Sequence, residues 1–392
     1  MRSVVVIIDG WTDAYDDDTA DLRPTWYRLA AVGTTGLVQW SSQLVWYPEE
    51  SCHWLELFSL DKVFTANHQA DPPLGWLQAH AFDKIRSEDG RTWCRLHLTH
   101  LYQQRDELLF MSPWRTGQTA DECQELAKAL ANEWQQDGWV VDATVGNGLL
   151  LSTQQAFRAR TAPLERLERQ SLADHLPSGR DGGLLRRLLV TGQMVLNRHT
   201  INRYRSASGR MPLNTPWLSG VGAVTNHLAA LPLNNSGRCW TTDPVVAGLA
   251  RLAGYRPILW TAEEDEMAHH LGRMIQDDRH SRLVIHLTTP ALLARHGLRQ
   301  QWRERVAWVD RMVLQPLTGL LDSDHDRLTV CSGYTADEHG LGLPSVAVPY
   351  VSATSRQMQR RSFFWQRNKP GQGNAVSPAL LMRPGPFTLG DE

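Results

Sequence analysis

The chain has 392 residues, enough for one large domain with an insertion or for two domains. Hydrophobic residues at 42% and charged residues at 21% are ordinary for a globular protein in water, and the formal net charge of −2 argues against nucleic acid or an anionic membrane as the main partner. No apolar run reaches the ~18 residues that a membrane span needs. The five cysteines are scattered and include no Cys-x-x-Cys pair, which argues against disulfides and a zinc site and predicts a cytoplasmic protein.

The first predicted element is a strand over residues 3–8, which ends in Asp9 and Gly10. Its five consecutive β-branched residues indicate a strand that is buried on both faces, as in a parallel sheet. Asp9 would lie beyond the carboxyl end of this strand, where α/β sheets bind ligands, and Gly10 would let the chain turn. A carboxylate there can bind a metal or orient a catalytic group. The alternative is a carboxylate that caps a helix or pairs with an arginine.

A separate block of elements is predicted in the first half of the chain. Alternating apolar residues over 90–115 indicate a hairpin, and an amphipathic helix follows over 119–134, with Thr119 as its cap. A strand over 139–141 completes a β-β-α-β arrangement. We therefore expect an inserted α+β cap domain at residues 62–160.

Outside this block, strands and helices alternate, which indicates an α/β core domain with a doubly wound, mostly parallel sheet over residues 1–61 and 161–352. Residues 353–392 form a basic and aromatic tail that either packs against its own domain or binds RNA or a partner. An acidic loop is expected at 13–21. The predicted helices are at 24–33, 184–205, 243–253, 263–275 and 297–321, and the predicted strands are at 36–40, 221–225, 258–260, 283–287 and 328–330.

The most distinctive stretch is residues 212–220, in which Asn214, Trp217 and Gly220 have the spacing Asn-x-x-Trp-x-x-Gly. Together with shorter stretches in the same order, it resembles the cofactor-independent phosphoglycerate mutases of archaeal type, which are members of the alkaline phosphatase superfamily. The chain is still more similar to poorly characterised bacterial relatives, some of which are labelled Rpf-type regulatory proteins. The resemblance implies an α/β fold of alkaline-phosphatase type. The shorter stretches are residues 4–10, 23–30, 176–179, 193–196, 246–254 and 347–350.

The resemblance also implies a phosphoryl-transfer site with two divalent metals and a serine nucleophile. Asp9 falls on the family's first metal ligand, and Ser51 falls on the nucleophile position. Two alternatives remain for this segment. Ser51 can be an ordinary polar loop serine, or Cys52 can serve as the nucleophile with His53 as its base.

Several ligands that the resemblance requires are missing from the second half of the chain. The acid that should follow the strand at 283–287 is replaced by Ala291, and the family's Asp-His pair falls on Ser332 and Gly333. The last histidine falls near Leu343. Hard divalent cations need several anionic oxygens or histidines around them. Asp9 with neutral neighbours cannot hold two such cations tightly.

We therefore expect a degenerate metal site and a non-catalytic ligand-binding or regulatory protein without a cofactor. Its partner would be a small phosphorylated compound or a protein, and neither a membrane nor nucleic acid is expected. Arg95, Asn214 and Trp217 would line the ligand cleft with Asp9, and Arg95 would contact an anion. Equally, Asn214 and Trp217 can fix a turn and fill the core.

The alternative function is a metal-dependent phosphotransferase or phosphatase. It would hold manganese or zinc with Asp9, would use Ser51 as its nucleophile, and would recruit histidines from elsewhere in the chain. The candidate histidines are His53, His68, His97, His100, His286, His296 and His339.

Overall fold

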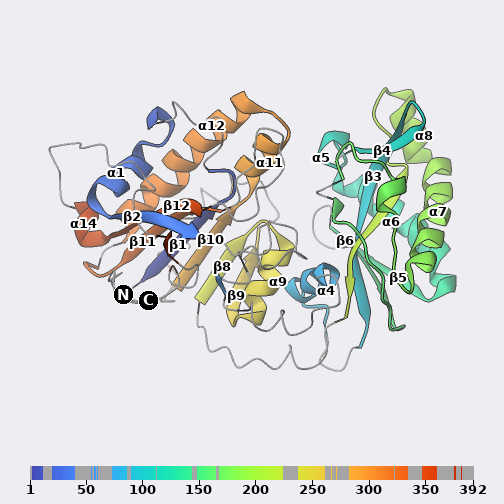
Figure 1. Cartoon of the computed structure of the whole chain (residues 1–392), viewed down its shortest axis with the longest axis horizontal. Coiled ribbons are helices and arrows are strands. Elements are labelled where there is room, and N and C mark those ends of the chain that lie inside the picture. The colour runs from blue at the N-terminus through green and yellow to red at the C-terminus, as the bar shows by residue number, and fades with distance from the viewer. Residues whose placement is uncertain are drawn as a thin grey trace. The chain divides into compact units, whose positions relative to one another are not determined.

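The computed structural model places most of the chain in two compact units. The first comprises Met1–Thr65 and Pro232–Glu392, and the second comprises Ala66–Leu231. Each unit has its own sheet (Figure 1). Each unit also has its own apolar core. The structure describes residues 2–11, 20–39, 54, 57, 58, 60, 73–85, 90–111, 113–143, 148–164, 167–223, 237–260, 266, 271, 282–321, 323–333, 347–359, 375, 376 and 381.

The first unit is built on an eight-stranded sheet in which β1 is central. β1 runs parallel to both of its neighbours, β10 and β11, and the parallel order continues outward from β10 through β8 to β9. On the other side of β1 the sheet contains antiparallel pairs, since β12 is antiparallel to both β11 and β2. All six residues of β1 are buried, as its β-branched run predicts. The strand order is β13 (Ala375–Val376), β2 (Thr34–Gln39), β12 (Ala347–Thr354), β11 (Arg327–Ser332), β1 (Ser3–Ile8), β10 (Arg282–Leu287), β8 (Gly237–Thr241) and β9 (Tyr255–Leu259).

Helices cover both faces of this sheet. The connection from β8 to β9 leads toward one edge, whereas the connection from β10 to β11 leads toward the other edge. Because such crossovers are right-handed, α9 and the helices between β10 and β11 lie on opposite faces. Val4, Val6 and Ile8 face the core that α1 and α12 cover. The helices are α1 (Pro24–Val32), α9 (Pro244–Leu252), α11 (Thr289–Arg295), α12 (Arg299–Val309), α13 (Gln315–Leu320) and α14 (Ser355–Gln359), with a short 3-10 turn at Ala20–Leu22.

The long helix expected at 297–321 is interrupted by a π-helical turn at Asp310–Leu314. The buried carboxylate of Asp310 accepts the N–H groups of Thr25 (2.9 Å) and Trp26 (3.1 Å) at the start of α1. The residue before α1, Arg23, provides no side-chain cap. Asp310 therefore caps α1 from another element, in a region of irregular helix that the sequence pattern did not predict.

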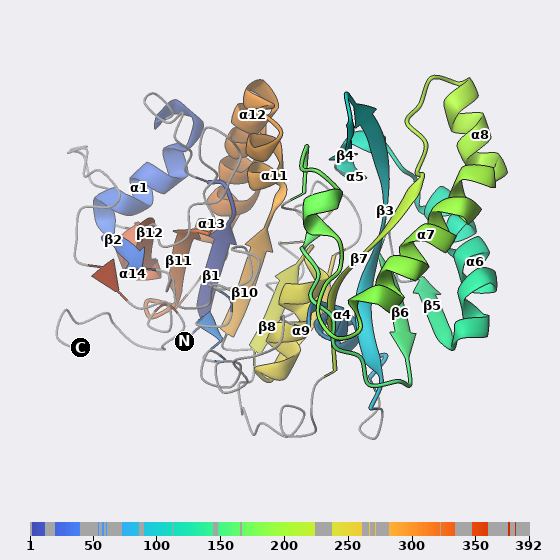
Figure 2. The ribbon, with the colours of Figure 1, turned by 45° about the vertical axis from the view of Figure 1, so that its right-hand side comes forward.

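The second unit has a five-stranded antiparallel sheet around the long strand β3, which pairs with β4, β6 and β7 (Figure 2). α6 and α7 bury their apolar faces in the core of this unit together with residues of β3 and β7. The strands are β3 (Thr92–Gln104), β4 (Glu107–Met111), β5 (Trp139–Ala143), β6 (Leu149–Thr153) and β7 (Thr215–Gly222). The helices are α4 (Leu74–Ala81), α5 (Pro113–Thr116), α6 (Ala120–Trp134), α7 (Gly182–Arg198) and α8 (Thr200–Ala207), with 3-10 turns at Gln135–Asp137 and Ala173–His175.

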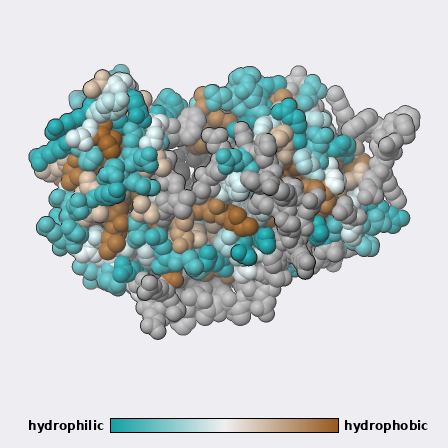
Figure 3. Space-filling model, turned by 180° about the vertical axis from the view of Figure 1, so that it is seen from behind, coloured by the Kyte–Doolittle hydropathy of each residue, from teal (hydrophilic) through white to brown (hydrophobic). Residues whose placement is uncertain are grey.

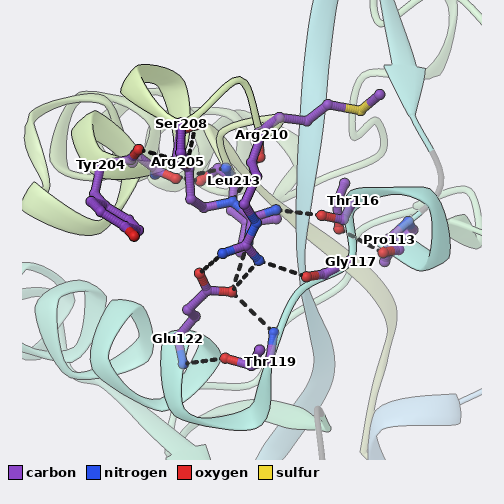
Figure 4. A network of polar contacts seen from close by, with 12 residues as sticks. Pro113, Thr116, Gly117, Thr119, Glu122, Tyr204, Arg205, Ser208, Arg210 and Leu213 are labelled. Atoms are coloured by element: carbon purple, nitrogen blue, oxygen red, sulfur yellow. Dashed lines mark hydrogen bonds and ion pairs between the residues drawn. The ribbon is translucent and has the colours of Figure 1, made fainter.

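A buried network fixes the start of α6 to the end of α8 (Figure 4). Glu122 closes a capping box with Thr119, and the same carboxylate binds Arg205 at 2.6 Å and Arg210 at 3.0 Å. The Arg205 side chain is fully buried and also donates to the carbonyl groups of Thr116 and Met211. Because all these acceptors come from separate segments, one guanidinium group ties them together.

The predicted α/β fold, with a doubly wound, mostly parallel sheet and a separate α+β unit inserted into it, is confirmed. The boundary differs, however. The second unit continues past the expected end at 160 to Leu231, because β7 pairs with β3 and α7 packs on α6. The expected helix at 184–205 is broken at His199, whose ring accepts the N–H of Ile201 and so caps α8.

Some expectations fall wholly or mostly outside the described residues: the acidic loop at 13–21, the helix at 263–275 and most of the tail at 353–392. Among the described helices, none is long and apolar enough to cross a membrane. On the face drawn in Figure 3 the described surface is largely hydrophilic, and apolar side chains form small patches on it.

Candidate functional site

Asp9 lies at the edge where the parallel strands of the first unit end. β10 and β11 flank β1 in register, so that Ile8 is level with Leu287 and with Ser332. The Asp9 N–H donates to the carbonyl of Leu287, and the Asp9 carbonyl accepts the N–H of Ala291, both at 2.9 Å. These backbone bonds fix Asp9 at the carboxyl edge of the sheet, where the sequence pattern placed it.

The Asp9 carboxylate is paired with the imidazole of His286. Asp9 Oδ2 lies 2.8 Å from His286 Nε2, and the two side chains are only 6% and 1% exposed. Since an ionised carboxylate only accepts hydrogen bonds, Nε2 carries the shared hydrogen. The other ring nitrogen, Nδ1, lies 2.8 Å from Thr241 Oγ1, which in turn accepts the N–H of Asp243. A chain of hydrogen bonds therefore crosses β8, β10 and β1.

The second oxygen of the Asp9 carboxylate lies against the backbone at Gly333. A Cβ atom at position 333 would come within 1.9 Å of Asp9 Oδ1. The Gly333 N–H donates to the Ile8 carbonyl at 3.0 Å, so this backbone is held close to β1. Gly333 is one of the two positions on which the resemblance led us to expect the family's Asp-His pair. The Asp9 carboxylate fills the space that a side chain there would need.

Gly10 makes the turn that the sequence predicted. Its φ is +70°, and a Cβ atom there would come within 2.4 Å of the Ala291 backbone. Its carbonyl accepts the indole N–H of Trp302 at 2.8 Å. α11 and α12 therefore pack directly on the turn that follows Asp9.

The surroundings of the pair are apolar and enclosed. Trp54 is fully buried and meets His286 edge to face, with ring centroids 4.5 Å apart. Burial, and secondarily the Asp9 charge, raises the pKa of the Cys331 thiol, so that Cys331 stays protonated at neutral pH. Cys331 therefore provides neither a thiolate nucleophile nor a thiolate ligand beside Asp9.

The described residues do not fit a two-metal centre. Within the ranges that the structure describes, no group of three or more histidine, cysteine, aspartate or glutamate side chains is placed to hold a metal ion. Asp9 and His286 are two potential ligands, and each is engaged by the other. Dications need several converging donors. Ser51, Cys52 and His53 lie outside the described residues.

Asn214 and Trp217 are held by internal bonds of the second unit. The Asn214 amide accepts the Leu101 N–H at 2.8 Å and donates to the Leu101 carbonyl at 2.9 Å. Trp217 is fully buried, donates to the Ala162 carbonyl at 2.9 Å and packs edge-on against Phe110. These contacts are those of the alternative in which Asn214 fixes the backbone and Trp217 fills the core.

Arg95 is half-buried on β3, where it is level with Leu150 of β6 and with Ser219 of β7. His97, two residues along the strand, has its Nε2 3.3 Å from the Ser219 hydroxyl. Arg95 thus belongs to the same sheet as Trp217, while Asp9 belongs to the first unit.

Sequence reasoning did not identify the partners of Asp9. His286 was only one of seven candidate histidines, although it is a polar residue inside an otherwise apolar strand, which is a recognisable signal. Thr241 was missed because β8, Gly-Arg-Cys-Trp-Thr, has little intrinsic strand preference, and it forms a strand through pairing with β10 and β9.

Comparison with known proteins supports the resemblance. No family model matches the chain. Over 130 residues it is 30% identical to a probable 2,3-bisphosphoglycerate-independent phosphoglycerate mutase of Geobacter sulfurreducens, a match that covers 33% of this chain and only 32% of that protein. Among solved structures, the PH0037 protein of Pyrococcus horikoshii is similar with a TM-score of 0.60 and 15% identity over 90% of this chain and 87% of the other.

The cofactor-independent phosphoglycerate mutase of Thermoplasma acidophilum is also similar, with a TM-score of 0.48 and 16% identity over 97% of this chain and 98% of the other. The matched region of the curated mutase is about a third of its length, so its activity is not transferred by this likeness. The predicted likeness to the phosphoglycerate mutases is confirmed: along about a third of its length the chain is similar to a probable phosphoglycerate mutase.

Proposed function

We propose that the chain is a phosphoglycerate-mutase-like protein of the alkaline phosphatase superfamily with a degenerate metal site, and that it acts in the cytoplasm as a non-catalytic ligand-binding or regulatory protein. The observation that carries this proposal is the state of Asp9. One carboxylate oxygen is bonded to His286, and the other lies against the Gly333 backbone.

The number of donors around Asp9 limits its use as a metal ligand. A metal-bound carboxylate must direct oxygen lone pairs at the cation, together with several other ligands. Asp9 directs one oxygen at an imidazole N–H, and the residue that would share its metal in the family is a glycine here. Without the charge of two dications, phosphoryl transfer loses its main source of transition-state stabilisation.

The ligand, under this proposal, is a small phosphorylated compound or a protein, and Arg95 is its candidate anion contact. Inorganic phosphate and 3-phosphoglycerate are suitable calorimetric probes for the first class. We expect that a probe that binds is not converted to product. We also expect the Arg95→Met variant to bind that probe at least ~10-fold more weakly than the wild type.

The second candidate function is a metal-dependent phosphotransferase or phosphatase that uses Asp9 and Ser51 with manganese or zinc. The likeness to the curated mutase favours it. Metal analysis of the purified protein, combined with phosphoglycerate mutase and phosphatase assays, distinguishes the two functions. The control variant is Asp137→Asn, at an exposed acid of the second unit. Stoichiometric metal and an activity that Asp9→Asn abolishes but Asp137→Asn preserves would overturn the non-catalytic proposal.

A further inference from the structure

The consecutive helices α7 and α8 carry charge of one sign. Residues 182–223 contain six arginines and no aspartate, glutamate or lysine, although the formal net charge of the whole chain is −2. The positive charge is therefore a local property of these helices and the segment after them. A one-sign surface of this kind attracts partners of the opposite charge.

Four of these arginines have partners inside the second unit. Arg205 and Arg210 bind Glu122, Arg187 pairs with Asp137 at 2.8 Å, and Arg186 donates to a backbone carbonyl. Arg198 and Arg203 differ from them. Both are exposed, and within the part of the chain that the structure describes neither guanidinium group forms an ion pair or a hydrogen bond.

Large apolar side chains are exposed on the same two helices. Val190 and Met194, one turn apart on α7, are 55% and 51% exposed, and Arg198 follows one turn later. Tyr204, next to Arg203 on α8, is 69% exposed. Val190, Met194 and Arg198 share one face of α7, and Arg203 and Tyr204 are exposed on α8, which begins at Thr200 directly after it. We call these five residues the α7–α8 surface.

The composition of this surface is typical of a protein interface. Arginine, tyrosine and methionine are enriched in such interfaces. Arginine also binds carboxylates in a bidentate manner that lysine cannot reproduce. The exposed apolar side chains beside the arginines favour a protein segment, which can cover them, over nucleic-acid phosphates, which cannot.

We propose that the α7–α8 surface docks an acidic amphipathic segment of a partner protein. Its carboxylates would pair with Arg198 and Arg203, and its apolar side chains would cover Val190, Met194 and Tyr204. This inference goes beyond the proposal for Asp9 and does not depend on it, since Asp9 belongs to the other unit.

The test uses the full chain and a fluorescein-labelled helical peptide with leucine at helical i, i+3, i+4 and i+7 positions and glutamate elsewhere. Fluorescence anisotropy at ~0.15 M salt measures its affinity. We expect binding by the wild type, a loss of at least ~10-fold in Arg198→Glu/Arg203→Glu, and a smaller loss in Met194→Ser. The matched control, Arg158→Glu/Arg160→Glu, reverses two exposed arginines elsewhere in this unit and should bind within ~2-fold of the wild type.

Circular dichroism and urea unfolding first establish that each variant is folded, which is expected because the altered side chains are exposed. Binding that survives reversal of Arg198 and Arg203, or no binding of the peptide by the wild type, would overturn the proposal. The same would follow if phosphatidylserine vesicles or a single-stranded RNA bound the surface and the acidic peptide did not.

Discussion

The carboxylates of Asp9 in the first unit and Glu122 in the second are both bonded to other side chains, but the two sets of partners differ. Glu122 accepts bonds from two guanidinium groups and from a helix N-terminus, and its partners tie three segments together. Asp9 has the His286 imidazole on one oxygen, and the backbone of Gly333 lies close to the other. Glu122 thus stabilises the packing of its unit, whereas Asp9 is buried at the carboxyl edge of the sheet.

The largest effect is expected at Glu122. Arg205→Met removes a fully buried guanidinium group and leaves Glu122 and two carbonyl groups with fewer donors. We expect the free energy of unfolding to fall by about 3–5 kcal/mol, measured by urea denaturation. Arg203→Met, at an exposed arginine two residues away, should change it by less than ~0.5 kcal/mol. Similar values for the two variants would show that the network does not stabilise the fold.

A smaller loss is expected at Gly333. In Gly333→Ala the new Cβ would overlap Asp9 Oδ1, so that the carboxylate must move away from its position beside His286. We expect a destabilisation of about 1–3 kcal/mol. Gly183→Ala is the matched control, since a Cβ there meets only the far end of the flexible Arg186 side chain and should be neutral or slightly stabilising. Equal effects would contradict the packing described for Asp9.

Much of the fold could be predicted because its signals are local. The β-branched run of β1, the turn at Gly10 and the capping box before α6 each identify their element without tertiary information. β8 and the extent of the second unit could not be predicted, because each depends on pairing with distant strands. The position of Asp9 was predictable from its strand, whereas its bond to His286 depends on two strands that are 277 residues apart in sequence.

The coupling between Asp9 and His286 can be measured directly. A double-mutant cycle with Asp9→Ala and His286→Ala should give an interaction free energy of about 0.5–3 kcal/mol, because each residue is the buried partner of the other. Urea unfolding of the four proteins provides the data. Strictly additive effects would mean that the two side chains do not stabilise each other.

The smallest expected effect is a dependence of stability on pH. Burial by itself would raise the pKa of Glu122, but the Thr119 N–H and the charges of Arg205 and Arg210 hold it below its ordinary value of 4.5. A carboxyl group of this kind stabilises the fold above its unfolded pKa, and this contribution is lost as the pH falls through the folded pKa. The stability difference between the wild type and Glu122→Gln should therefore shrink on acidification below about pH 4.5. A constant difference would contradict the pKa direction.

The central claim is that Asp9 is committed to His286 rather than to a metal, and thermal unfolding with and without manganese or zinc tests it most directly. A ligand that binds the native state raises the unfolding temperature, and the stabilisation grows with the logarithm of the ratio of its concentration to its Kd. We predict that neither ion gives a stabilisation that depends on Asp9, so that the wild type and Asp9→Asn respond alike. A rise in unfolding temperature in the wild type that is lost in Asp9→Asn would contradict the claim.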